Sequence, residues 1–239
     1  MAAGSATAIG GLIALRNRSL SPRVTAFSLG FAGGVMVIVS FVSLLVESLS
    51  MVTYLSAAIV FSLGAGLMIL LDLSLPHMEF SMRESGMVDM KLFRSGTLIA
   101  IGISLHNLPE GLVISAGYAH LPQLGIVIAL AVLLHNIPEG IATALPLLAA
   151  RVKPQRAIGL TLLSGLAEPL GSLLGATVLV GASTETVGSA LAFAAGVMTY
   201  VTVDELIPVA HSYGHKHAVS LGLLLGIMFM MLLLNVLGY

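Results

Sequence analysis

The chain has 239 residues, of which 57% are hydrophobic and 9% are charged, and its formal net charge is −1. A soluble domain of this length does not need so large an apolar fraction, whereas a chain that crosses a bilayer does. The composition therefore excludes an ordinary soluble domain and predicts an integral membrane protein, all-α and polytopic. Cysteine is absent, so disulfides and thiolate ligands are excluded, and any metal site must use nitrogen and oxygen.

Eight apolar runs follow one another along the chain. The first, from Ala2 to Leu15, is short of a hydrocarbon core about 30 Å thick at about 1.5 Å per residue. A signal peptide is the competing interpretation, but no basic region precedes the run and no convincing cleavage site follows it. The other seven are long enough to span, at residues 24–46, 52–71, 95–118, 122–150, 157–183, 186–208 and 218–238. We therefore predict eight transmembrane helices, the first of them short or truncated.

The ten lysine and arginine residues indicate the orientation. All of them fall in the links between helices 1 and 2, 3 and 4, 5 and 6, and 7 and 8. By the positive-inside bias these links are cytoplasmic, so both termini are predicted to be external, in a plasma (inner) membrane. The longest link, residues 75–91, is polar and charged and is predicted to be a cytoplasmic loop. No second domain is apparent, so residues 1–239 are expected to form a single transmembrane transport domain.

The most informative feature is a repeated hexapeptide, HNLPEG at residues 106–111 and HNIPEG at residues 135–140. Midway between the two copies, the stretch GYAHLPQLG has the glycine and proline of a turn. The fourth and fifth helices are therefore expected to form a hairpin with arms of equal length, whose motifs face each other near mid-membrane. Within each copy the histidine and the glutamate are four residues apart, which places them on one face of a helix.

Facing arms would gather two imidazoles and two carboxylates, from His106, Glu110, His135 and Glu139. That set suits a first-row divalent ion such as Zn²⁺, Fe²⁺, Mn²⁺ or Co²⁺. Asn107 and Asn136 are rotated about 100° from the histidines and could offer amide oxygens to a second ion, with the glutamates bridging. In the sixth run, Glu168 lies at a similar depth beside Pro169 and is expected to join the site.

A structural role for these side chains is the alternative. A lone buried histidine is usually a satisfied core residue, but an ionisable side chain at the bilayer centre costs at least about 2.5–3.5 kcal/mol and is functional by default. Three glutamates and two histidines at one depth therefore favour a site. Pro109 and Pro138 remove helical donors, and loosened backbone is tolerated at this depth mainly where it lines a wet cavity.

Further polar residues lie toward the membrane surfaces. The candidates for an exit path on the cytoplasmic side are Asp204, Glu205 and His211, followed by His215 and His217, with Asp72 and His77 as weaker candidates. The candidates on the external side are Glu47, Glu185 and His120. A solvated helix end explains the histidines of the cytoplasmic group equally well, and an interfacial carboxylate such as Glu47 needs no special explanation.

The motifs HNLPEG, HNIPEG and SGLAEP (residues 164–169) resemble the ZIP (Zrt-, Irt-like) family of divalent metal transporters, in particular its bacterial ZupT-like branch. AFSLGFAGGVM at residues 26–36 and AGVMTYVTVDELIP at residues 195–208 are similar to the second and seventh helices of that branch. The resemblance therefore runs along nearly the whole chain. The link between helices 3 and 4 holds one histidine, His77, where many relatives have a histidine-rich run.

The resemblance implies a 3+2+3 arrangement, with helices 1–3 and 6–8 related as an inverted repeat around helices 4 and 5. It also implies a binuclear metal centre on the transport path. One subsite would use His106, Glu110, His135 and Glu139, and its neighbour Asn107, Glu110, Asn136, Glu139 and Glu168.

The predicted function is transport of divalent first-row ions toward the cytoplasm, with zinc first and iron, manganese, cobalt or cadmium as further substrates. The metal is cargo, and no cofactor is expected. The expected partners are the ions and the lipid bilayer, without nucleic acid. Small-residue faces such as Gly30, Gly33 and Gly34 could pack within one chain or between two copies of a homodimer.

The alternative function is an intramembrane metal-dependent hydrolase, because histidines and carboxylates can also activate water. A zinc protease would be expected to carry HExxH, with a glutamate as the base between two ligands of one helix. Each helix of this chain offers HNxPE instead, and every glutamate is needed as a ligand. The sequence therefore predicts a transporter and not an enzyme.

Overall fold

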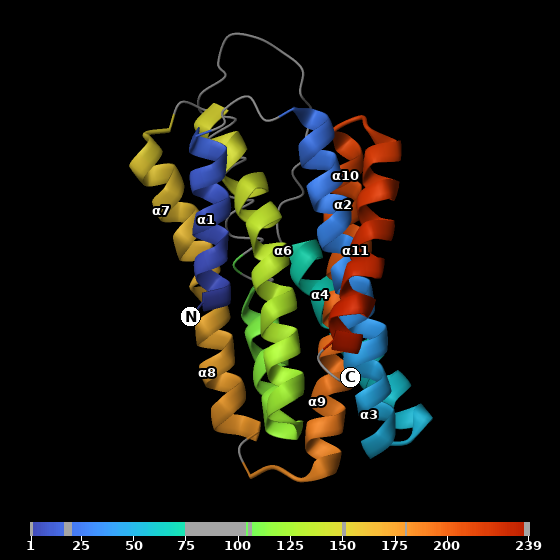
Figure 1. Ribbon diagram of the computed structural model, residues 1–239. Coiled ribbons are helices and arrows are strands. Elements are labelled where there is room, and N and C mark those ends of the chain that lie inside the picture. Colours follow the sequence, from blue (N-terminus) through green and yellow to red (C-terminus); the bar gives the residue numbers. More distant parts are fainter. Residues whose placement is uncertain are drawn as a thin grey trace.

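The computed structural model describes residues 2–16, 21–74, 104, 107–149, 152–179 and 181–236. Within these ranges the regular structure is helical and no strand occurs (Figure 1). The helices are α1 (Ala2–Arg16), α2 (Pro22–Ile38), α3 (Val46–Met51), α4 (Tyr54–Ser74), α6 (Pro122–Ala149), α7 (Pro154–Gly165), α8 (Ala167–Leu179), α9 (Thr184–Tyr200), α10 (Ile207–Ser212) and α11 (Lys216–Val236), and a further helix covers residues 107–120. Two π-helical segments, η1 (Val39–Leu45) and η2 (Val201–Leu206), join α2 to α3 and α9 to α10.

Six helical stretches of the described residues are long and apolar enough to cross a membrane. They are Pro22–Met51, Tyr54–Leu73, Pro122–Leu145, Pro154–Leu179, Thr184–Ser212 and Lys216–Val236. Helix α1 is apolar but shorter. The prediction of an all-α polytopic membrane protein is therefore confirmed. The predicted loop at residues 75–91 and the first half of the predicted span at residues 95–118 lie outside the described residues.

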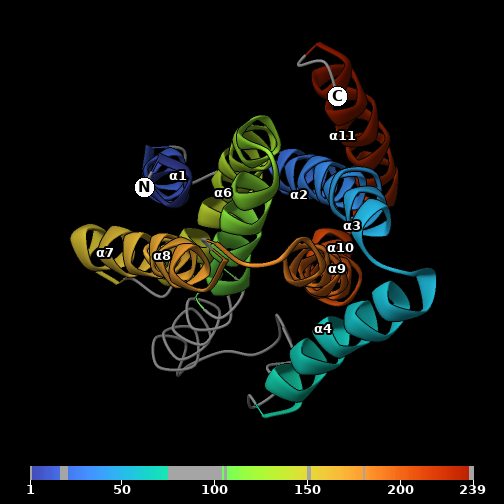
Figure 2. The same cartoon turned by 90° about the horizontal axis from the view of Figure 1, so that it is seen from below.

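The helices form two groups, as the view along the bundle shows (Figure 2). Helix α1 packs against α6 and α7, and α8 continues α7 on the same side. In the other group α2 packs against α11, and α4 packs against α9. The groups meet where α2 contacts α6. Large apolar side chains remain exposed along α4, α8 and α11, as expected for helices that face lipid.

Local sequence explains where several helices begin. Ser21 precedes α2, and its hydroxyl accepts a hydrogen bond from the Val24 N–H (3.2 Å), while Pro22 occupies the first turn, where no helical donor is needed. Ser183 caps α9 in the same way through the Thr186 N–H (3.2 Å). Leu121 alone separates the helix of residues 107–120 from α6, so the hairpin turns where the glycine and proline pattern predicts it.

Two predicted spans differ from the structure in detail. The span predicted at residues 157–183 is one helical stretch, Pro154–Leu179, with a turn at Leu166 between α7 and α8. Pro169 explains the turn, because it has no N–H to bond to the Gly165 carbonyl four residues earlier. The span predicted to end at residue 208 continues to Ser212. There the Ile207 N–H bonds to Thr202, five residues earlier, and this wider π turn accommodates Pro208 within the helix.

Candidate metal centre

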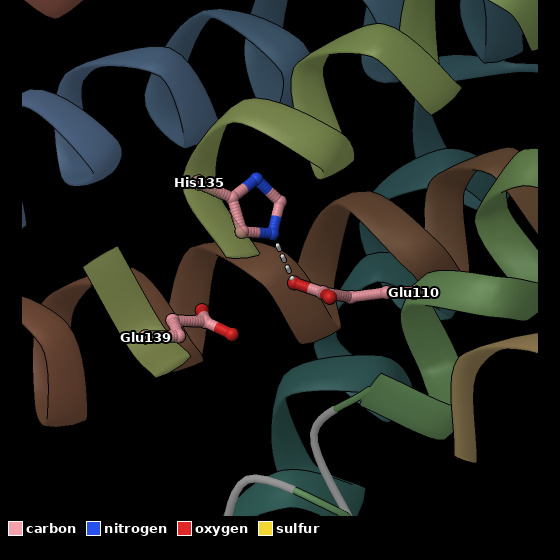
Figure 3. A group of neighbouring side chains, drawn as sticks. All are labelled: Glu110, His135 and Glu139. Atoms are coloured by element: carbon pink, nitrogen blue, oxygen red, sulfur yellow. Dashed lines mark hydrogen bonds and ion pairs between the residues drawn. The ribbon is translucent and has the colours of Figure 1, made fainter. Parts of the chain in front are cut away.

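Three potential metal ligands meet between the two arms of the hairpin. Glu110, His135 and Glu139 each offer an atom within 4.8 Å of the others (Figure 3). The closest contact joins Glu110 Oε1 to His135 Nε2 at 2.9 Å. All three residues are at most 3% exposed. His106, the first histidine of the motifs, lies outside the described residues, so its position in this group stays a prediction.

The positions of these residues along the two helices explain why their side chains meet. His135 and Glu139 are one turn apart on α6, so they present their side chains to the same neighbour. Glu110 is in the first turn of the helix of residues 107–120, which runs beside α6 in the opposite direction because only Leu121 separates the two. Equal arm lengths thus bring the glutamate of one motif to the histidine of the other.

In both motif asparagines the amide nitrogen donates a hydrogen bond to a backbone carbonyl, whereas the amide oxygen has no hydrogen-bond partner among the described residues. Asn107 Nδ2 donates to the Ser164 carbonyl at 3.0 Å, and Asn136 Nδ2 donates to the Ala3 carbonyl at 3.0 Å. Both side chains are fully buried, and neither Oδ1 atom has a hydrogen-bond partner among the described residues. A buried amide oxygen without a partner is costly, and a cation is a suitable partner for it.

Glu168 reaches the same centre from the third side. Its Oε2 accepts a hydrogen bond of 2.6 Å from Asn136 Nδ2, and the residue is 1% exposed. Glu168 lies in the first turn of α8, because α8 starts just before it, after the turn at Leu166. The positive end of that helix dipole favours a carboxylate at this position.

The donor set indicates which ligand fits. It consists of one imidazole, three carboxylates and two amide oxygens, and all of these residues are buried. Ligand atoms about 2.0–2.2 Å from a tetrahedral zinc ion lie roughly 3.3 Å from one another, and the ligand atoms of Glu110, His135 and Glu139 all lie within 4.8 Å of one another. Three buried carboxylates repel each other, and a divalent cation offsets that repulsion and the cost of burying them.

The candidates predicted for the cytoplasmic side are more exposed. The Tyr200 hydroxyl lies within hydrogen-bond distance of Asp204 (3.0 Å) and of Asp72 on α4 (3.2 Å), so these two carboxylates sit close together. Glu205 is half-buried beside Asp204 in η2. His211 lies further along, in a cavity of about 700 Å³ that Arg23 and Lys216 also line. Since those two charges oppose a cation, His211 has the least favourable surroundings of the predicted exit residues. His77 lies outside the described residues.

Two of the external candidates form a pair. His120 Nε2, at the tip of the hairpin, lies 3.0 Å from Glu47 Oε2 on α3. Both side chains are partly exposed. Glu185 is exposed in the first turn of α9. The pair connects the hairpin to the second helix group at the end of the bundle opposite Arg23 and Lys216.

Sequence reasoning missed the backbone partners of the site. The carbonyls of Ala3 and Ser164 hold the two asparagine nitrogens and so turn the amide oxygens elsewhere. Every residue has a carbonyl, so no side-chain pattern could have identified these two. The short apolar run at the beginning of the chain indicated only a membrane helix, whereas α1 lies against the site itself.

Comparison with known proteins identifies the family of this chain. A family model described as "ZIP Zinc transporter" matches residues 78–234. The "Zinc transporter ZupT" of Chlorobaculum parvum is 38% identical over 246 residues, covering 95% of this chain and 92% of the relative. The protein of the same name from Corynebacterium glutamicum is 39% identical over 241 residues, covering 94% and 92%. The one from Stenotrophomonas maltophilia (strain R551-3) is 38% identical over 242 residues, covering 95% and 89%. With a family match over most of its length and relatives aligned almost end to end, the chain belongs to the ZIP zinc transporter family.

Proposed function

We propose that this protein carries zinc across the plasma (inner) membrane into the cytoplasm. Other first-row divalent ions, such as iron, manganese and cobalt, are further substrates, and so is cadmium. The observation that carries this proposal is the buried group of Glu110, His135 and Glu139, joined by Glu168 through Asn136. Its nitrogen and oxygen donors suit borderline ions such as Zn²⁺. The names of the relatives, which are zinc transporters, support zinc as the main substrate.

The centre is proposed to be binuclear. One subsite uses His106, Glu110, His135 and Glu139, and the other uses Asn107, Glu110, Asn136, Glu139 and Glu168. Two observations support the second subsite: the two asparagine oxygens have no hydrogen-bond partner within the described ranges, and Glu168 adjoins Asn136. Glu110 and Glu139 bridge the two ions, because each carboxylate has two oxygens that can bind different metals.

The proposed topology has eight helices in a single domain over residues 1–239, with helices 1–3 and 6–8 as an inverted repeat around the hairpin. Both termini are external, and residues 75–91 form a cytoplasmic loop. Ions enter near Glu47 and His120, and they leave past Asp204 and Glu205, with His211 beyond. Alternating access by one helix group moving against the other is the mechanism that an inverted repeat favours. Small-residue faces also leave room for a homodimer.

Uptake into proteoliposomes tests the proposal. Vesicles loaded with a zinc-sensitive dye should fluoresce when zinc is added outside, and Glu139→Ala and His106→Ala should each lower the initial rate by at least about 10-fold, since each removes a ligand. Vesicles without protein provide the background. Undiminished uptake in both variants would contradict the site assignment. If well-folded protein takes up no divalent ion at all, the transport function itself is wrong.

A further inference from the structure

The asparagine contacts described above form a symmetric pair. Asn107, on one arm of the hairpin, donates to Ser164 at the end of α7, and Asn136, on the other arm, donates to Ala3 at the beginning of α1. Asn107 and Asn136 are equivalent in the two motifs. Ala3 and Ser164 are therefore equivalent as well, and the segments that follow them share the pattern Gly-x-Ala-x-x-x-Gly, at residues 4–10 and 165–171.

Close backbone contacts extend the same equivalence. A Cβ atom at Gly111 would overlap the carbonyl oxygen of Glu168, and a Cβ atom at Gly140 would overlap that of Thr7. In the same way a side chain at Gly171 would meet Leu108, and one at Gly10 would meet Ile137. Gly4 and Gly165 meet each other, as residues beside a two-fold axis must. In α1 and α7–α8, equivalent residues always differ by the same residue number: 3 and 164, 4 and 165, 7 and 168, 10 and 171. In the hairpin they differ by another constant number: 107 and 136, 108 and 137, 111 and 140.

This local two-fold relation makes Thr7 the equivalent of Glu168. Figure 1 agrees, because the N-terminal end of α1 lies beside the junction of α7 and α8, about halfway along the bundle. Thr7 is fully buried, and a Cβ atom at Gly165 would lie 2.9 Å from its hydroxyl oxygen. The Thr7 hydroxyl thus lies beside Gly165, which is about one helical turn before Glu168 in the chain.

The Thr7 hydroxyl differs from the hydroxyls of three other buried threonines. Thr143, Thr161 and Thr202 are also buried, and each donates to the carbonyl four residues earlier, at 2.7–2.9 Å. For Thr7 that carbonyl belongs to Ala3, which already accepts the Asn136 hydrogen bond. The Thr7 hydroxyl has no hydrogen-bond partner in the described part of the chain. A buried hydroxyl left in this way requires another partner.

The two-fold relation also indicates where the partner of the Thr7 hydroxyl lies. Glu168 reaches Asn136 directly, at 2.6 Å. The equivalent of Asn136 is Asn107, whose Oδ1 has no hydrogen-bond partner among the residues described. Threonine is shorter than glutamate, so Thr7 cannot bridge the equivalent distance. A water molecule fits between two buried polar groups of this kind, provided that it has further polar partners.

We propose that Thr7 is a further residue of the metal centre, whose hydroxyl accepts a hydrogen bond from a water molecule bound to the ion at the Asn107 side of the second subsite. This inference rests on the proposed transport function. The water is one ligand of the divalent cation, Asn107 Oδ1 is another, and Thr7 orients the water without binding the metal. Opposite Glu168, the centre therefore keeps an exchangeable ligand in place of a fourth carboxylate.

A neutral residue at this position favours release. A fourth buried carboxylate would bind the ion directly and hold it by charge, whereas a water ligand leaves more easily when the ion moves on. Removing the hydroxyl would leave the metal-bound water without its acceptor, and loss of such outer partners typically weakens metal binding. Thr7 thus balances capture of the ion against its release.

The test uses four variants of the full-length protein in detergent and in proteoliposomes. Thr7→Val keeps the shape and removes the hydroxyl, Thr7→Ser keeps the hydroxyl, and Thr7→Glu restores the symmetric carboxylate. Thr25→Val is the matched control, because Thr25 is also buried and its hydroxyl also has no partner among the described residues, but it lies on α2 in the other helix group. Zinc affinity is measured by competition with a chromophoric chelator, uptake with the zinc-sensitive dye, and thermal stability without metal.

Thr7→Val should weaken zinc binding by about 10-fold, while Thr7→Ser and Thr25→Val stay within about 2-fold of the natural protein. Thr7→Glu should bind zinc about 10-fold more tightly and transport it more slowly. Unchanged affinity in both Thr7→Val and Thr7→Glu would overturn the role of Thr7, even if Glu139→Ala abolishes uptake. A loss of metal-free stability in Thr7→Val that equals the loss in binding would also overturn it in favour of packing. If the natural protein binds no zinc, the proposed function and this inference fail together.

Discussion

Glu110→Gln is expected to lower zinc affinity by at least about 100-fold and to abolish zinc uptake. Glutamine keeps the size of Glu110 and can still hydrogen-bond to His135 Nε2, now 2.9 Å from the carboxylate. Only the charge and one metal-binding oxygen are lost. Because Glu110 is the proposed bridge between both subsites, neither ion keeps its full ligand set.

The control for this variant makes the same chemical change elsewhere. Glu84→Gln lies in the predicted loop at residues 75–91 and should leave affinity and uptake unchanged. The measurements are chelator competition for affinity and dye-loaded proteoliposomes for uptake, with a thermal melt to verify folding. Uptake by Glu110→Gln within about 2-fold of the natural protein would show that the carboxylate does not bind the transported ion.

Gly140→Ala is expected to destabilise the protein by about 1–3 kcal/mol, although it adds a single methyl group. The new Cβ would overlap the Thr7 carbonyl oxygen, and that atom belongs to the backbone of α1 and cannot rotate away. Helix α1 would have to move from α6, which would also stretch the hydrogen bond from Asn136 to Ala3. A lower melting temperature should therefore appear together with weaker zinc binding.

Gly159→Ala is the matched control, because a Cβ atom there has no atom within 4 Å. It lies in α7, where alanine favours the helix more than glycine does, so its melting temperature should not fall. Melts recorded with excess chelator separate the packing effect from any loss of bound metal. Equal melting temperatures for the two variants would mean that α1 does not approach α6 as closely as the structure places it.

The membrane itself explains why much of the fold was predictable. A spanning helix must bury about 20 apolar residues, so the length of an apolar run fixes the helix closely. The run at residues 122–150 became α6 (Pro122–Ala149), and the run at residues 218–238 became α11 (Lys216–Val236). The repeated HNxPEG motif made the family predictable from the sequence as well. The ZIP resemblance and the prediction that the chain is not an enzyme are both confirmed by the family match and the transporter relatives.

The features that could not be predicted depend on which helices are neighbours, and hydropathy does not determine this. The composition of η1 is that of an ordinary apolar helix, and the two carboxylates of η2 do not indicate a π turn, so nothing in the sequence distinguished these segments. Apart from Arg16 at its end, helix α1 offers no ionisable side chain, and its contribution to the site is a carbonyl at Ala3 and, as proposed, a hydroxyl at Thr7. A threonine in an apolar helix ordinarily bonds to its own backbone, and only the contact of Asn136 with Ala3 reveals that Thr7 does not.

The two π segments also place wider turns directly after α2 and α9. A π turn holds about one residue more than an α turn, so it is a stored insertion of roughly 1.5 Å of helix. If the wide turn moves along the helix by exchanging hydrogen-bond partners, the backbone on one side slips past its neighbours while both ends stay in place. Asp204 and Glu205 lie within η2, so such a slip would rotate these two carboxylates without unfolding the helix that carries them.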